Sequence, residues 1–238
     1  MNSLITYNDF GDDVTAFVTR RTVGRNRQRI CELLDIDDQH LIYPHQTHED
    51  RILVIDESFI NLEDEKKKDI LEGIDAVITP LKDICIGVST ADCIPVLVYD
   101  QEHQVAAAIH AGWRGTVKRI VEKTIDKMVE TFSSRPESLK AIIGPGITLK
   151  NFEVGDEVYD NFATEGFDME KIAKRETKWH IDLHECNKLQ LIKKGLQEAN
   201  INVDATCTFD NTDILFSARV EQKGIEKCGR NFNGIIIR

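Results

Sequence analysis

The chain has 238 residues, of which 41% are hydrophobic and 30% are charged. A chain of this size and composition can bury a large core in one domain, which excludes the disordered, collagen-like and low-complexity classes. Its formal net charge of −11 argues against a dedicated nucleic-acid binder, because a phosphate backbone requires a positive surface. A few local arginines can nevertheless hold a small anionic substrate.

The N-terminal segment MNSLITYNDFGDDVTAFVTR lacks a basic start followed by an apolar run, so we expect no signal peptide. No stretch approaches the ~18 apolar residues that indicate a membrane span. The six cysteines are scattered along the chain, without the dense spacing of secreted disulfide frameworks. These features predict a cytoplasmic protein with reduced thiols.

Strands and helices are expected to alternate along the chain. The hydrophobic patterns of the first half predict a helix over 26–34 and strands in 14–20, 50–55, 84–90, 93–100 and 105–110. The second half predicts helices at about 116–132, 155–165 and 187–199, and strands in 141–147, 207–209, 214–220 and 233–238. The charged run 63–69 is typical of a solvated surface. This mixture predicts a single mixed α/β domain over residues 1–238.

The most informative feature is a predicted hairpin about the polar residues 100–103. Antiparallel pairing about this loop places residues whose numbers sum to 203 opposite each other, so that Cys93 faces His110. Directly opposed Cβ atoms lie ~4.5–5.5 Å apart, a separation across which a thiolate and an imidazole can share one zinc ion. Pro95 cannot donate a hydrogen bond to a neighbouring strand, which predicts an edge strand or an irregular start.

A third ligand is available upstream, in the segment Pro44-His45-Gln46-Thr47-His48. Spacing alone leaves His45 and His48 equally eligible. The alternative interpretation is that Cys93 is a packed thiol and that each histidine is an ordinary hydrogen-bonded side chain.

The string HAGWRGT follows the second strand of the hairpin. Its glycines permit a tight turn, and a helix beginning at Thr116 would place free amide groups beside His110. Arg114 adds a bidentate donor for phosphate or carboxylate. Trp113 can stack on a planar base or pack in the core. The simpler alternative is a glycine turn that only connects strand to helix.

Several longer motifs occur in one order and cover nearly the whole chain: GIDAVIT, STADCIPVLVYD, AAIHAGWRGT, IIGPGI, FEVGDEV and CTFDNTDILFSARV. Together they resemble the YfiH-like laccase-domain family. Its members have been labelled multicopper polyphenol oxidases, peptidoglycan editing factors and zinc-dependent purine nucleoside phosphorylases. The resemblance implies one mixed α/β domain of the YfiH type, with β-sheets and flanking helices. It also implies a metal site formed by His48, Cys93 and His110, and so selects His48 over His45.

The function that this resemblance implies is that of a zinc-dependent purine nucleoside phosphorylase with an adenosine deaminase side activity. Expected substrates are phosphate and adenosine, inosine, guanosine or methylthioadenosine. The expected cofactor is Zn²⁺, which copper can replace in vitro. We expect no nucleic-acid or membrane partner, and a monomer or a weak homo-oligomer. The expected catalytic residues are His48, Cys93, His110 and Arg114, and the expected contacts to substrate or phosphate are Arg114, Arg219 and Arg230.

The chain departs from the family pattern at three places. The N-terminal segment TRRTVGRNR is compressed, Gly146 stands where relatives commonly have a cysteine, and Ala218 replaces the usual aromatic residue before Arg219. The resemblance therefore implies no particular substrate contact from the compressed segment.

Three alternative functions follow from the same residues. A copper-dependent polyphenol oxidase of the laccase type is disfavoured, because seven histidines in the whole chain are too few for a coupled copper set. A thiol hydrolase in peptidoglycan editing would use Cys93 as nucleophile and His110 as base. A non-catalytic module stabilised by a metal is the third. A Cys93 thiolate that binds zinc cannot also act as a free nucleophile. The metal content of the purified protein therefore distinguishes the zinc enzyme from the thiol hydrolase.

Other polar residues have secondary roles in this interpretation. Asp75 and Asp92 lie in motifs and are expected to support the fold or the metal ligands. Glu49 is a candidate acid/base for deamination. His180 and His184 could form a second metal pair, but surface or strand-edge roles are favoured for them. Cys207 and Cys228 are expected to be packed thiols.

Overall fold

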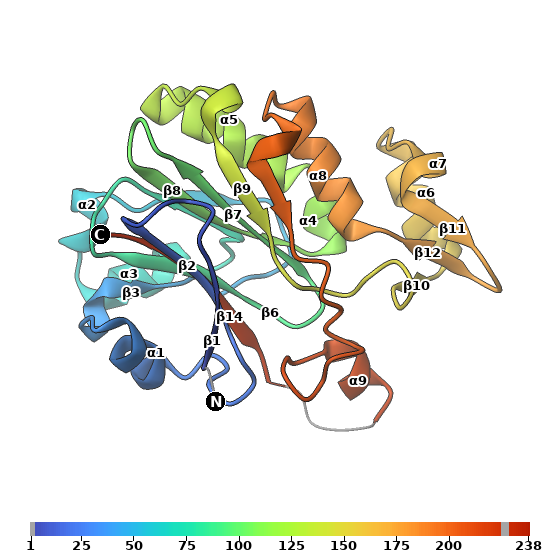
Figure 1. Ribbon diagram of the computed structural model, residues 1–238, viewed down its shortest axis with the longest axis horizontal. Coiled ribbons are helices and arrows are strands. Elements are labelled where there is room, and N and C mark those ends of the chain that lie inside the picture. Colours follow the sequence, from blue (N-terminus) through green and yellow to red (C-terminus); the bar gives the residue numbers. More distant parts are fainter. Residues whose placement is uncertain (1–2, 225–228) are drawn as a thin grey trace.

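A computed structural model describes residues 3–224 and 229–238. Two sheets form its centre (Figure 1). The six-stranded sheet has the order β13-β9-β7-β8-β5-β4. Its strands are β4 (Ile52–Val54), β5 (Ala76–Thr79), β7 (Ile94–Asp100), β8 (Val105–Ala111), β9 (Lys140–Ile143) and β13 (Ile201–Val203).

The five-stranded sheet has the order β1-β2-β14-β6-β3 and joins both ends of the chain. Its strands are β1 (Leu4–Tyr7), β2 (Val14–Thr19), β3 (Leu41–Ile42), β6 (Cys85–Thr90) and β14 (Asn231–Ile237). A smaller sheet contains β10 (Glu153–Val154), β11 (Ala173–Arg175) and β12 (Trp179–Ile181). The helices are α1 (Arg27–Leu34), α2 (Glu57–Ile60), α3 (Asp64–Leu71), α4 (Trp113–Val117), α5 (Ile120–Phe132), α6 (Asp156–Thr164), α7 (Met169–Ile172), α8 (Leu183–Lys193) and α9 (Ala218–Gln222).

Alternation of side chains along the strands explains the layers. In β7, Val96 and Val98 share one core with residues of α5 and α8, whereas Leu97 and Tyr99 share a second core with β2, β6 and β14. Successive residues of a strand point to opposite faces, so β7 is buried on both sides. A third core lies between the outer face of the five-stranded sheet and α1. The two sheets are therefore packed face to face between helices (Figure 1), which confirms the expected mixed α/β class.

The hairpin β7–β8 forms, but its predicted register is wrong by two residues. Opposed residues sum to 205, so Pro95, not Cys93, lies opposite His110. The reason is the loop: the Asp100 carboxylate accepts backbone N–H bonds from Glu102 and His103, which ends the strand at Asp100 and makes 101–104 the connection. A shift of two keeps every side chain on its predicted face.

Of the two alternatives that Pro95 predicted, the edge position is wrong, and the irregular start is found on the side that faces β9. β7 pairs with β8 on one side and with β9 on the other. Pro95 is tolerated because the ladder to β9 begins one residue later, at Val96, and the Pro95 carbonyl oxygen still accepts from Gly144 N–H at 2.9 Å.

The expected helix at 116–132 is divided into α4 and α5. The chain becomes helical already at Trp113, and Arg119, with φ 64°, interrupts it before α5 begins. The Thr116 N–H donates to the Gly112 carbonyl oxygen at 2.8 Å. This amide is therefore not available to a ligand, contrary to the sequence-based expectation.

Three further expectations in the C-terminal third need correction. α8 starts earlier than predicted because Asp182 caps it at its N-terminus, and it stops before Gly195, which has φ +100°. The segment 207–209 makes only an isolated bridge, and 214–220 is a turn that leads into α9. The hydrophobic residues there, such as Leu215 and Val220, are buried one at a time and not along a strand. Within the described residues, no helix is long and apolar enough to cross a membrane.

Candidate metal centre and active site

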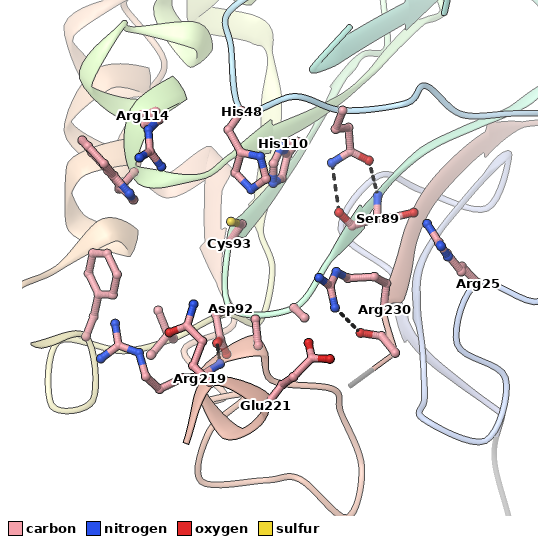
Figure 2. A pocket seen from close by; sticks show the side chains of 18 of the residues that line it. Arg25, His48, Ser89, Asp92, Cys93, His110, Arg114, Arg219, Glu221 and Arg230 are labelled. Carbon is pink, nitrogen blue, oxygen red and sulfur yellow. Dashed lines mark hydrogen bonds between the residues drawn. The ribbon is translucent and has the colours of Figure 1, made fainter. Parts of the chain in front are cut away.

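Three segments that are distant in sequence meet at one end of the six-stranded sheet. His48 lies between β3 and β4, Cys93 immediately precedes β7, and His110 lies near the end of β8. Their ligand atoms all lie within 4.8 Å of one another, and the two imidazole rings are 4.8 Å apart between centroids (Figure 2). Zinc bonds of about 2.0–2.3 Å require only a small inward movement of such side chains. The donor set therefore fits a borderline-soft metal ion.

Asp75 connects two of the three candidate ligands. Its fully buried carboxylate accepts the backbone N–H groups of Thr47, His48 and Glu49 at 3.2, 3.0 and 2.9 Å. It also accepts from the His110 ring at Nδ1, at 2.7 Å. This contact leaves the other ring nitrogen of His110 for a metal, as carboxylates do in many metal sites. His48 itself has φ 64°, and the bond from its N–H helps to hold this unusual backbone conformation.

The electrostatics of the cluster favour a thiolate. Burial raises the pKa of Cys93, but the neighbouring His110 and His48 outweigh burial and lower this pKa to about 6. For His110, burial lowers the pKa, but Cys93 and Asp75 outweigh it and raise this pKa to about 9. A thiolate is the form of cysteine that binds metals and attacks electrophiles.

The structure separates the two histidines that spacing left equivalent. His45 points to solvent and its Nδ1 lies 2.7 Å from Glu72. Gln46 lies between them, and its side-chain amide donates to the Ser89 carbonyl oxygen at 2.9 Å and accepts from the Ser89 N–H at 2.7 Å. These two bonds fix the segment to β6 and leave His48 in the cluster. Gln46 was not identified from sequence, although its position between the two histidines was a usable signal.

Gly112 provides the space that the cluster needs. A Cβ atom at this position would lie 3.0 Å from Cys93 Sγ, 3.2 Å from His48 Cδ2 and 3.7 Å from His110 Cε1. The backbone of Gly112 is extended, with φ −67°, so the glycine is required by close approach and not by an unusual dihedral angle. The sequence indicated a turn here and missed this contact.

The cluster opens into a cleft of about 610 Å³ that contains several arginines. The expected substrate residues Arg114, Arg219 and Arg230 all line it (Figure 2). Arg114 is exposed, and its guanidinium lies 4.3 Å from the ring centroid of Trp113. Arg219 Nη1 donates to the Glu153 carbonyl oxygen at 3.1 Å. Arg25, from the compressed N-terminal segment, also lines the cleft and was not identified from sequence.

Asp92 supports the wall of the cleft. With φ 80°, it forms the turn before Cys93, and its carboxylate accepts from the Thr208 hydroxyl and the Arg219 N–H, each at 2.6 Å. These bonds connect the Cys93 loop to Thr208 and to α9. Asp92 thus has the supporting position that its motif suggested.

The remaining candidates lie outside the cluster. Glu49 forms an ion pair with Lys118 at the surface. His180 Nδ1 contacts the Leu149 carbonyl oxygen, and the buried His184 contacts the Gly144 carbonyl oxygen. In the part of the chain that the structure describes, neither histidine belongs to a group of potential metal ligands. Cys207 is buried, and Cys228 lies outside the described residues.

Comparison with known proteins gives consistent results. A family model described as multi-copper polyphenol oxidoreductase laccase matches residues 9–238. A purine nucleoside phosphorylase of Bacteroides thetaiotaomicron is 43% identical over 218 residues, which cover 90% of this chain and 80% of that protein. A protein named adenosine deaminase RL5, from an unknown prokaryotic organism, is 40% identical over 205 residues, with coverages of 85% and 76%.

The fold is similar to that of solved structures. The hypothetical protein YfiH of Bacillus licheniformis matches with a TM-score of 0.90 at 24% identity, covering 100% of this chain and 97% of that one. YlmD of Geobacillus stearothermophilus matches with a TM-score of 0.88 at 23% identity, covering 100% and 97%. With the family model matched over residues 9–238, the chain belongs to the YfiH-like laccase-domain family.

Proposed function

We propose that residues 1–238 form one catalytic domain, a zinc-dependent purine nucleoside phosphorylase that releases the base from adenosine, inosine, guanosine or methylthioadenosine. The observation that carries this proposal is the cluster of one thiol and two imidazoles at the base of an arginine-lined cleft. The name of the 43% identical relative, purine nucleoside phosphorylase, supports an enzyme of nucleoside metabolism.

His48, Cys93 and His110 would hold the zinc ion. Three protein ligands are typical of catalytic zinc sites, where the ion acts as a Lewis acid with one open coordination position. Asp75 keeps His110 in the tautomer that leaves its second ring nitrogen for the ion. The exposed guanidinium of Arg114 lies on the cleft beside the cluster and would bind and orient phosphate through two charge-assisted hydrogen bonds. Arg219 and Arg230 would add positive charge on the opposite wall.

Adenosine deamination is proposed as a side activity of the same site. The relative named adenosine deaminase supports it, as does the similarity of a His/Cys donor set to zinc nucleobase deaminases. Glu49 is poorly placed as the acid/base, because its carboxylate already pairs with Lys118.

The experiment that tests this function is incubation of the as-purified protein with inosine and with adenosine, each with and without phosphate. Chromatography should show hypoxanthine released from inosine only when phosphate is present, and some inosine formed from adenosine in both conditions. Release of hypoxanthine without phosphate, or no conversion at all, would contradict the proposal.

A thiol hydrolase is the second candidate, because Cys93 is activated by two imidazoles, as in cysteine enzymes. It requires a Cys93 thiolate that is not bound to a metal ion. Cys93→Ala should therefore abolish both metal binding and turnover if zinc is the cofactor. Retention of the metal with loss of turnover would favour the thiol mechanism. The copper oxidase that the family description names would require additional histidine clusters, and the described residues contain one metal-binding group.

A further inference from the structure

The tripeptide Gly-Arg-Asn occurs twice in the chain, at 24–26 and at 229–231. The first copy lies between β2 and α1, where Asn26 caps the helix by accepting from Arg29 N–H at 3.0 Å. The second copy leads directly into β14. The two copies lie at opposite ends of the sequence, and each brings an arginine to the cleft.

Both copies pack on the ring of Phe216. A Cβ atom on Gly24 would lie 3.1 Å from Phe216 Cε2 and 3.1 Å from the Arg230 carbonyl oxygen, and a Cβ atom on Gly229 would lie 2.7 Å from Phe216 Cζ. Gly24 also has φ +55°, which favours glycine. The two glycines therefore allow the two backbones to approach the same ring closely, and Arg25 and Arg230 line the same side of the cleft (Figure 2).

Phe216 is itself held in place. Its N–H donates to the Asn231 side-chain oxygen at 3.1 Å, and the Asn231 amide donates to the Phe216 carbonyl oxygen at 3.3 Å. The guanidinium of Arg21 lies 4.8 Å from the ring centroid. The pair of arginines thus stands on a packed support and not on a loose surface loop.

This arginine pair lies on the other side of the cluster from Arg114 (Figure 2). Arg25 is exposed, and within residues 3–224 and 229–238 its guanidinium makes no hydrogen bond or ion pair. Ser89 lies between the pair and the cluster (Figure 2), and its hydroxyl oxygen is buried without a hydrogen-bond partner among the described residues. Two neighbouring cations in a chain of net charge −11, beside an unsatisfied hydroxyl, favour a bound anion.

We propose that Arg25, Arg230 and Ser89 form a second anion subsite, distinct from Arg114, that binds the phosphate group of a phosphorylated nucleoside. This inference rests on the proposed function and extends its substrate class to nucleoside 5′-monophosphates. In this arrangement the co-substrate phosphate binds at Arg114 and the ribose lies at the cluster. The arginine pair then binds the 5′-phosphate group of the ribose. A planar guanidinium pair matches a phosphate monoester through bidentate hydrogen bonds.

The test is calorimetric binding of inosine 5′-monophosphate, inosine and inorganic phosphate to the as-purified protein in phosphate-free buffer. The monophosphate should bind at least about tenfold more tightly than inosine, since it adds charge-assisted hydrogen bonds. Arg25→Ala should remove most of this advantage and leave inosine binding unchanged. Arg27→Ala is the matched control, because Arg27 is close in sequence but pairs with Asp38 and does not line the cleft.

Equal binding of inosine and its monophosphate, or an advantage that persists in Arg25→Ala, would overturn the inference. Loss of inorganic phosphate binding in Arg25→Ala, without any advantage of the monophosphate, would also overturn it, because the arginine pair would then serve the co-substrate. Phosphate-dependent release of hypoxanthine from inosine is measured in parallel. Its absence from a protein that still binds the monophosphate through Arg25 would overturn the proposed function and leave the subsite intact.

Discussion

Asp75→Asn tests whether one carboxylate organises the metal centre. An amide has one acceptor oxygen and turns an NH₂ group toward the other donors, so it cannot satisfy the three backbone N–H groups and the His110 ring that bind Asp75. Each hydrogen bond to a buried charged group contributes about 1.5–3 kcal/mol. We therefore expect the free energy of unfolding of the metal-free protein to fall by about 3–5 kcal/mol.

The same change should lower zinc affinity by about tenfold to a hundredfold, the usual effect of removing a carboxylate that orients a histidine ligand. Denaturant unfolding of metal-free protein and competition with a chromophoric chelator measure the two quantities separately. Asp100→Asn is the matched control. Asp100 is equally buried and accepts from two backbone N–H groups and the His103 ring, at the far end of the β7–β8 hairpin.

Asp100→Asn should therefore destabilise the protein but leave zinc affinity unchanged. Wild-type zinc affinity in folded Asp75→Asn would show that this carboxylate does not organise the metal centre. An equal loss of affinity in both variants would show the same, because the effect would then follow from stability alone.

Three further predictions concern the cluster and its cleft. Gly112→Ala should lower zinc affinity at least about tenfold, because the added methyl group lies 3.0 Å from Cys93 Sγ; unchanged metal binding would contradict the close-packing argument. Arg114→Ala should slow phosphorolysis of inosine at least about tenfold and adenosine deamination less, at unchanged zinc content; equal losses would limit Arg114 to a structural role. In metal-free protein, alkylation of Cys93 should stay fast as pH falls to about 6 and slow only below it, because His110 and His48 outweigh burial and lower the pKa of this thiol to about 6. Alkylation that slows already near pH 8, as followed by peptide mapping, would contradict this lowered pKa.

The sequence predicted the cluster better than it predicted the hairpin that carries it. The predicted register was two residues off because the Asp100 carboxylate, through its own backbone contacts, decides where the strand ends. The error left His110 on its predicted face, since strand side chains repeat every two residues, and Cys93, which precedes β7, still lies beside it. A register shift of one residue would have turned His110 to the other face.

Features that depend on long-range packing could not be predicted. The sequence shows the two Gly-Arg-Asn copies, but only the fold shows that both meet at Phe216. The choice between His45 and His48 was made by resemblance, whereas in the structure it follows from Gln46 bonding to the Ser89 backbone. The interruption of the helix at Arg119 is similarly absent from the hydrophobic pattern, which continues through it.

Elemental analysis of protein purified without chelators tests whether His48, Cys93 and His110 hold a zinc ion. We expect about one zinc ion per chain, and no zinc in Cys93→Ala prepared in the same way. Wild-type protein without metal, or with several copper ions per chain, would contradict it.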